Sequence, residues 1–208
     1  MKKGFTLVEM IATLVILSIV AVIVTPNIYV SIKDYKNRLF ETQMDNIKQA
    51  AKNWAVDNVD KLPDSSQKAL AVTISDLQND GYIEANLKNP RDGGVFDDSS
   101  VFVLITCDYI EDETSNLASN YKYDYEVYEN VEDYIKKQAV LYAKKNKITS
   151  NTSITVAELK TNNYISNKII YENASELVVP NNTIVIAVTT SEDSKTGDTI
   201  YEYSAKIG

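Results

Sequence analysis

Histidine is absent from this chain of 208 residues, and cysteine occurs only once, as Cys107. The missing histidine excludes serine-histidine and cysteine-histidine nucleophilic catalysis, together with metal sites built on histidine ligands. The single cysteine excludes an internal disulfide and every Cys-x-x-Cys motif. Since the sequence also has no phosphate-binding loop, we expect no catalytic site, no metal site and no cofactor, and therefore no enzyme.

Positive charge is also scarce, because 21 lysine and arginine residues face 29 acids and leave a formal net charge of −8. This balance disfavours nucleic-acid binding, which depends on the neutralisation of phosphates by basic side chains. A small basic group remains at Lys144, Lys145 and Lys147. The length and the hydrophobic content of 44% are sufficient for a membrane helix and one or two small domains.

The first 27 residues combine two lysines, one acid and a long apolar run. Lys2 and Lys3 precede Glu9, and residues 10–24 are mainly apolar. The run approaches the roughly 20 residues of a membrane-crossing helix, and the lysines predict a cytoplasmic N-terminus. No Ala-x-Ala cleavage site follows the run, so we expect the segment at residues 5–27 to stay attached. An acid at such depth is costly, which makes Glu9 a candidate functional residue.

The order Gly4-Phe5-Thr6-Leu7-Val8-Glu9 before an apolar helix resembles the class III signal peptide of type IV pilins and pseudopilins. The resemblance implies that residues 1–4 are a leader, that a prepilin peptidase cuts between Gly4 and Phe5, and that the new amine of Phe5 is methylated. Cleavage removes two lysines and no acid, which changes the side-chain charge from −8 to −10. The implied partners are other pilin subunits, the peptidase and the pilus assembly platform.

The same resemblance gives Glu9 a role in assembly. A helix rises about 1.5 Å per residue, so Glu9 lies roughly 6 Å along the axis from Phe5. Its carboxylate could therefore meet the Phe5 amine of an axially displaced neighbour. Because an unpaired buried charge costs far more than a paired one, this register would be favoured in a filament core.

Pro26 predicts a kink or the end of the membrane helix, because proline lacks the backbone donor and clashes with the preceding turn. The apolar spacing resumes beyond it, mostly at intervals of three or four residues. The positions concerned are Ile28, Ile32, Tyr35, Leu39, Ile47, Ala51 and Trp54. This spacing favours a kink in a continuing amphipathic helix.

An internal repeat is visible in several short segments. Residues 47–55 correspond to residues 135–143, and residues 72–77 correspond to residues 154–159. Thr73 with Asp76, and Thr155 with Glu158, have the spacing of a capping box and predict two short helices. Gly81 and Asn163 then stand at equivalent positions and suit the left-handed conformation that ends a helix.

Two pairs of predicted strands follow the two capped helices. Residues 101–105, before Cys107, and residues 184–188 are continuous apolar runs, expected to be central strands covered on both faces. Residues 121–127 and 201–207 alternate in polarity and predict half-buried strands. Residues 108–120 and 190–199 are expected to be polar hairpin connections.

The predicted fold is therefore α+β: a long N-terminal helix on an antiparallel sheet, followed by a second helix-plus-sheet headgroup. The first headgroup is assigned to residues 28–128 and the second to residues 129–208. This duplication resembles the dual-pilin arrangement of minor pilins in some Gram-positive bacteria. Many pilins of other lineages close the C-terminal region with a disulfide, which this chain cannot form.

Acidic side chains near the first hairpin, at Asp97, Asp98, Asp108, Glu111, Asp112 and Glu113, leave two interpretations open. They could bind calcium through carboxylate oxygens, or form a solvated acidic loop, which the missing Asp-x-Asp-x-Asp-Gly pattern favours.

Two functions are compatible with the sequence. The first is a minor pilin in the cytoplasmic membrane, and then in a surface filament, with a double head that meets host cells or surfaces. The second is a pseudopilin of a type II secretion or competence DNA-uptake machine. The enlarged head favours the minor pilin.

Overall fold

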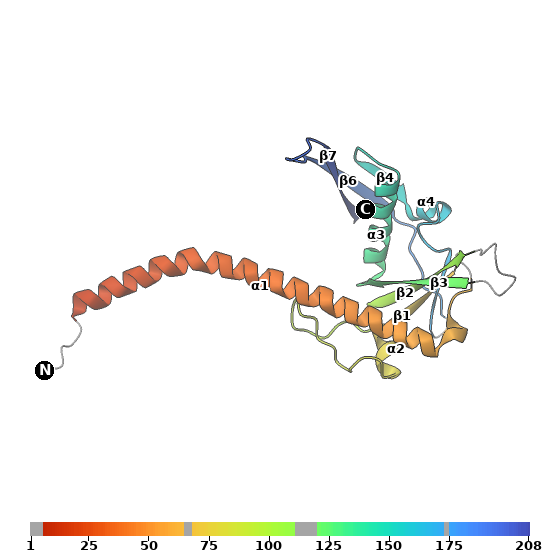
Figure 1. Cartoon of the computed structure of the whole chain (residues 1–208), viewed down its shortest axis with the longest axis horizontal. Helices are drawn as coiled ribbons and strands as arrows, with labels where there is room; N and C mark the ends of the chain where they lie inside the picture. Colours follow the sequence, from red (N-terminus) through yellow and green to blue (C-terminus); the bar gives the residue numbers. More distant parts are fainter. Residues whose placement is uncertain (1–5, 65–67, 111–119, 173–174) are drawn as a thin grey trace. The chain divides into compact units, whose positions relative to one another are not determined.

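The computed structural model describes residues 6–64, 68–110, 120–172 and 175–208, and it describes their side chains except at residues 23–27, 108–110 and 120 (Figure 1). The chain divides into two compact units, residues 1–44 with 88–95, and residues 45–87 with 96–208. The elements in chain order are α1 (Leu7–Asp57), the 3-10 helix η1 (Val59–Lys61), β1 (Lys68–Thr73), α2 (Ile74–Asn79), β2 (Phe102–Ile110), β3 (Asn120–Tyr128), α3 (Val131–Lys145), β4 (Thr152–Thr155), α4 (Val156–Thr161), β5 (Lys168–Tyr171), β6 (Thr183–Glu192) and β7 (Thr199–Ile207).

The first unit contains most of α1 and one turn-rich segment, residues 88–95. The segment is closed by a bridge between Lys88 and Val95 and by the Asn89 amide, which donates to the Gly94 carbonyl at 2.7 Å. The guanidinium of Arg91 lies 3.5 Å from the ring centroid of Phe40, a buried residue of α1. This stack fastens the segment to the helix.

α1 is assigned as one helix from Leu7 to Asp57, so the expected continuation past Pro26 is confirmed. The kink itself stays a prediction, because the side chain at this position lies outside the described residues.

Within the part of the chain that the structure describes, no helix has both the length and the apolar content required to cross a membrane. The membrane-spanning role of residues 5–27 is not confirmed.

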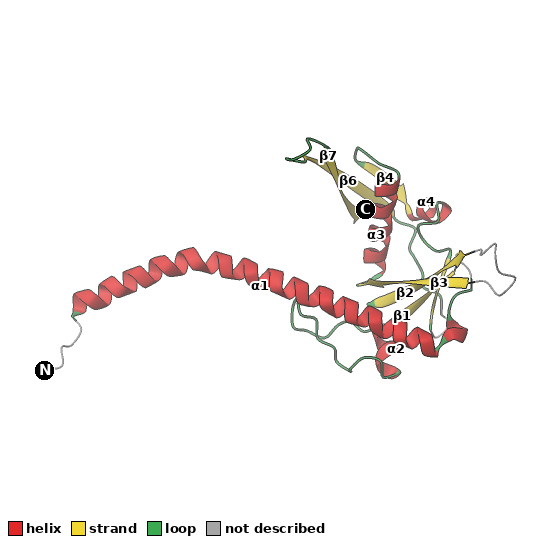
Figure 2. Cartoon of the chain, viewed as in Figure 1, coloured by secondary structure: helices red, strands yellow, loops and turns green. Residues whose placement is uncertain are grey.

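The second unit holds two sheets (Figure 2). One has the strand order β3-β2-β1-β5 and the other β4-β6-β7. In the first sheet, β1 ends at Thr73 and pairs antiparallel with β2, so that Thr73 faces Phe102. In the second sheet, β4 ends at Thr155 and pairs antiparallel with β6, so that Thr155 faces Thr183. Apart from β5, which stands between α4 and β6 in the second copy, the order helix, strand, short helix, strand, strand thus occurs twice with matching register.

The helix caps predicted from the sequence are confirmed. Thr73 with Asp76 and Thr155 with Glu158 form reciprocal capping boxes at the starts of α2 and α4. Gly81 and Asn163, which follow these helices, have positive φ angles of 79° and 59°. The strands β1 and β4, which lead into the caps, were not predicted. β1 begins Lys-Ala-Leu-Ala, and these residues have a high helix propensity. The sequence therefore gives no local signal for a strand, and the extended conformation of β1 depends on its pairing with the adjacent strands.

The expectation of purely antiparallel sheets is wrong at one edge. β5 comes from the second repeat but pairs in parallel with β1, residue Ile169 beside Ala69. The first sheet is therefore mixed, and it contains a strand from each side of the expected boundary at residue 128. The second sheet is antiparallel throughout its described pairs.

The two apolar central strands differ in burial. β2 is covered on both faces, as expected, since Phe102, Val103 and Ile105 are all fully buried. In β6, Ile184 and Ile186 are fully buried but Val185 between them is 44% exposed, so the expectation of two covered faces is wrong there. The reason is that α3 packs against one face of this three-stranded sheet, whereas in the first sheet the residues on both faces of β2 are buried.

One face of the first sheet is covered by elements of the second repeat, including α3. Alternate residues of β1 and β2, including Ala71, Phe102 and Leu104, share one core cluster with α3 residues such as Ile135 and Ala139. The C-terminal part of α1 lies on the same sheet, where Lys48 pairs with Glu126 of β3 at 3.3 Å (Figure 1). The two repeats therefore have a common core.

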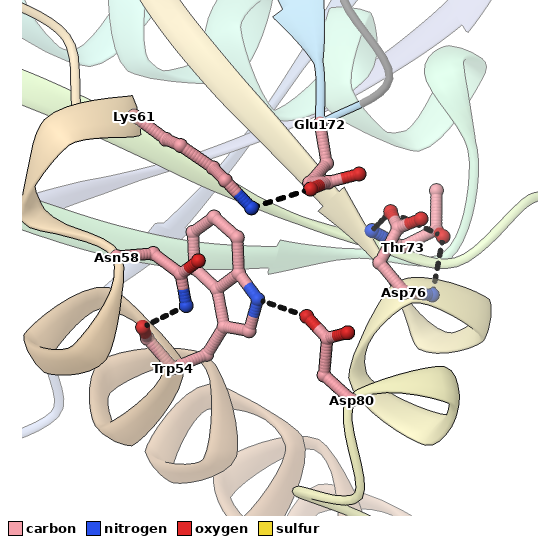
Figure 3. A network of polar contacts seen from close by, with 7 residues as sticks. All are labelled: Trp54, Asn58, Lys61, Thr73, Asp76, Asp80 and Glu172. Carbon is pink, nitrogen blue, oxygen red and sulfur yellow. Dashed lines mark hydrogen bonds and ion pairs between the residues drawn. The ribbon is translucent and has the colours of Figure 1, made fainter.

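Polar contacts join the end of α1 to both repeats (Figure 3). The indole of Trp54 is fully buried and donates to the Asp80 carboxylate at 2.7 Å. Lys61 of η1 pairs at 2.7 Å with Glu172, which directly follows β5. The hydrogen bond to Glu172 raises the pKa of Lys61. These contacts fix the end of the long helix beside the mixed sheet.

Candidate functional site

The start of α1 is organised by two residues of the expected processing motif. The backbone amide and the hydroxyl of Thr6 both donate to Glu9 Oε2 at 2.9 Å, and the Glu9 amide donates to the Thr6 hydroxyl at 3.3 Å. This reciprocal arrangement is a capping box, in which a threonine and a glutamate three residues later satisfy amides at a helix start. Glu9 therefore stabilises the first turn of α1.

This third capping box was missed from the sequence, although Thr6 and Glu9 have the same spacing as the two boxes that were recognised. The spacing of Thr6 and Glu9 is the sequence signal that indicates this cap. Gly4 and Phe5 lie outside the described residues, so their roles in cleavage and methylation stay predictions.

The Glu9 side chain retains capacity for a second partner. Both donors from Thr6 reach Oε2, and among the described residues none donates to Oε1. An ionised carboxylate has about four lone-pair sites, so the cap uses only part of them. The carboxylate can thus hold the helix start and accept an incoming amine at the same time.

The described side chains that follow Glu9 form an exposed apolar surface. The large residues are all at least half exposed, which is unusual for a solvated helix. They are Met10, Ile11, Leu14, Val15, Ile16, Leu17, Ile19, Val20 and Val22. A surface of this kind marks contact with other proteins or with lipid.

A polar cavity of about 420 Å³ lies between the two repeats within the second unit. Asp124, Glu126 and Tyr128 of β3 line one side, and Gln138 of α3 and the turn at residues 163–167 line the other. The Gln138 amide donates to the Tyr128 hydroxyl at 3.0 Å. Burial raises the pKa of Tyr134, which also lines the cavity, to about 12, so this phenol stays neutral. The cavity offers polar contacts, and the buried Cys107 adds a thiol to its lining.

The acidic residues near the first hairpin are described only in part. The Asp97 carboxylate accepts from the Ser99 hydroxyl at 2.8 Å, and hydrogen bonds to Ser99 lower the pKa of Asp97. The side chain of Asp108 and residues 111–113 lie outside the described residues, so the calcium interpretation is not tested there. Elsewhere in the described chain no group of three metal-binding side chains is found.

Comparison with known proteins places these features in a family context. Residues 1–25 match the family model described as the prokaryotic N-terminal methylation motif. A ComG operon protein 3 homolog from Bacillus licheniformis is 27% identical over 90 residues, which cover 43% of this chain and 84% of the relative. No solved structure matches. The methylation motif and the similarity to this relative both support a type IV pilin-like subunit.

Proposed function

We propose that the chain is a minor type IV pilin. In this proposal, prepilin peptidase removes residues 1–4 and methylates Phe5, residues 5–27 hold the subunit in the cytoplasmic membrane, and the assembly platform transfers it into a surface filament. The observation that supports this most directly is the methylation motif over residues 1–25. The exposed apolar side chains of α1 supply the contact surface that such a filament core requires.

Glu9 has a double role in the proposed assembly. Thr6 holds the carboxylate beside the first turn of α1, where the partial positive charge of the helix start also favours an anion. An axially displaced subunit then brings its Phe5 amine to Oε1, and the two charges neutralise each other. Pre-orientation by Thr6 reduces the ordering cost of this contact. Pro26 is proposed to let the helix bend between the filament core and the head.

The repeated topology supports sparse incorporation. Residues 28–128 and 129–208 are proposed as two pilin-like headgroups, an enlarged head that would crowd a densely packed filament. The polar cavity between the repeats offers a surface for contact with host cells, surfaces or another protein. A Gram-positive source is part of the same proposal, by analogy with dual pilins.

The second candidate is a pseudopilin of a type II secretion or competence machine. The same processing motif would serve it, and similarity to a ComG operon protein 3 homolog fits it equally well. The difference between the candidates is where the processed chain resides.

Immunogold electron microscopy of native cells, combined with mass spectrometry of sheared surface filaments, tests the proposal. Sparse label along extended filaments, and a first peptide that begins at methylated Phe5, are expected for a minor pilin. Dense, uniform label would make the chain a major pilin. A processed chain confined to the envelope, together with loss of DNA uptake or secretion on gene deletion, would favour the pseudopilin.

A further inference from the structure

Charge is divided unequally between the two units. Residues 1–44 with 88–95 hold seven lysine and arginine residues against four acids, a balance of +3. The remaining residues hold fourteen against 25, a balance of −11. In an acidic protein, the unit that carries the apolar helix thus has a net positive charge, which is +1 once Lys2 and Lys3 leave with the proposed leader.

Part of this positive charge surrounds a hollow of about 350 Å³ on the first unit. Its lining consists of Tyr29, Ile32, Lys33, Lys36, Asn37 and Arg91. Three of these side chains are cations and none is a carboxylate. All belong to the same compact unit.

The hollow is built by one helix face and one fixed turn. Tyr29, Lys33 and Lys36 follow at intervals of four and three residues, so they lie along one face of α1. The segment at residues 88–95 adds Arg91, which is held by its stack on Phe40 and by the Lys36 ammonium, 3.3 Å from the Arg91 carbonyl. The arginine is therefore positioned by the fold.

The lining combines positive charge with exposed apolar surface. Tyr29 is 71% exposed and Ile32 is 51% exposed, directly beside Lys33 and Lys36. A free phosphate ion would use only the cations. A phospholipid presents a phosphate next to a glycerol and acyl chains, so it matches both parts of the lining. Tyrosine is also a residue that favours the membrane interface.

The position of the hollow along α1 is consistent with binding of a phospholipid headgroup. Tyr29 is five residues beyond Val24, where the apolar run ends, and Lys36 is twelve beyond it, which is roughly 7 Å and 18 Å along the axis. The headgroup layer is about 5–8 Å thick on each side of the bilayer. Helix side chains lean toward the N-terminus, and long lysine stems extend further, so the ammonium groups of Lys33 and Lys36 can approach this layer.

We propose that this hollow binds the headgroup phosphate of an anionic phospholipid while the subunit resides in the membrane, an inference that rests on the proposed membrane-anchored pilin function. The bound lipid fixes the base of the helix at the membrane surface, and the acidic second unit is repelled by the same surface. Transfer into a filament must then release this lipid.

Two experiments on the full chain test lipid binding by the hollow separately from the proposed membrane-anchored pilin function. Flotation with neutral phosphatidylcholine vesicles tests the membrane anchor: a chain that stays out of these vesicles overturns the proposed pilin function. Native mass spectrometry of the chain in neutral detergent, with phosphatidylglycerol or phosphatidylcholine added, tests the hollow. We expect a preference for phosphatidylglycerol of roughly a hundredfold at low salt, about fivefold for each of the three cations.

The matched variants remove equal charge at two places. Lys33→Gln/Lys36→Gln/Arg91→Gln is expected to lose the preference, whereas Lys144→Gln/Lys145→Gln/Lys147→Gln keeps it. Lys33→Gln/Lys36→Gln, which leaves the stack of Arg91 on Phe40 in place, loses most of it even if the triple variant is misfolded. Equal binding of both lipids by the unmodified chain overturns the inference, as does an equal loss in both triple variants. Displacement by inorganic phosphate at the lipid's own concentration would make free phosphate the ligand and overturn it too.

Discussion

Glu9 takes part in two interactions that place different demands on its side chain. The cap on Thr6 needs an acceptor, which glutamine also provides, whereas the proposed pair with a Phe5 amine needs a negative charge. We therefore expect Glu9→Gln and Glu9→Ala to leave cleavage at Gly4 largely intact and to reduce incorporation into filaments by a similar large factor. Mass spectrometry of sheared filaments and of membranes measures both steps.

Thr6→Ala is the matched control for these two variants. It removes the cap, at a cost of about 1 kcal/mol to the helix start, and keeps the charge. We expect near-normal incorporation of this variant. Normal incorporation of Glu9→Gln, combined with failure of Thr6→Ala, would mean that the cap and not the charge pairing governs assembly.

Asp80 supports the stability of the second unit through the buried indole of Trp54. Asp80→Ala leaves the indole donor, 2.7 Å from the lost oxygen, without this acceptor in a fully buried position. We expect a loss of about 1–3 kcal/mol in the free energy of unfolding. Because Trp54 is the only tryptophan, its fluorescence during denaturant titration reports the change directly. Asp60→Ala removes an exposed acid nearby and should have little effect; equal losses in both variants would contradict the assigned role.

At the scale of elements, the cap of α4 makes stability depend on pH. The Thr155 amide and hydroxyl donate to Glu158 Oε2 at 2.7 and 2.9 Å, and these bonds lower the pKa of Glu158 from the ordinary value of 4.5. The folded pKa lies below the unfolded one, so the stabilisation is complete above pH 4.5 and is lost as the pH falls through the folded pKa.

Glu158→Gln keeps an acceptor for the cap but does not titrate. We therefore expect a weaker decline of the unfolding free energy below pH 4.5 than in the unmodified chain, in denaturant titrations over a series of acidic pH values. Glu202→Gln, on an exposed part of β7, serves as the control and should leave the decline unchanged. A decline in Glu158→Gln as steep as in the unmodified chain would refute this contribution.

The sequence predicted the elements whose signals are local. Reciprocal caps at Thr73 and Thr155 and the left-handed Asn163 depend on a few neighbouring residues, and the structure has them where they were expected. β5 could not be predicted, because its parallel pairing with β1 joins residues about 100 positions apart and neither strand shows a period of its own. The exposure of Val185 has the same origin, since it depends on which sheet face has a covering helix.

At the scale of the whole molecule, the two topological repeats share one core within the second unit. The matching registers of Thr73 with Phe102 and Thr155 with Thr183 preserve the repeat. β5 and the shared core cluster tie one repeat to the other. A boundary at residue 128 therefore separates two similar patterns, and the cooperative folding unit is expected to include both.

Truncation of the chain after Tyr128 tests this expectation. The truncated chain loses β5 and exposes one face of the first sheet, including Phe102 and Leu104, which are both buried in the full chain. Uncovering side chains of this size costs about 1.5–3 kcal/mol each, and typical domains have only 5–15 kcal/mol of stability. We expect the truncated chain to lose its cooperative unfolding transition or to aggregate, measured by circular dichroism during denaturant titration in detergent.

The control replaces residues 191–200, the exposed end of the β6-β7 hairpin, with an Asn-Gly turn, which suits a tight hairpin. This control should unfold in one transition, as the full chain does, because it leaves the shared core in place. A truncated chain that unfolds as sharply as the full chain would show that the first repeat is a self-sufficient headgroup and that the second is an addition to it.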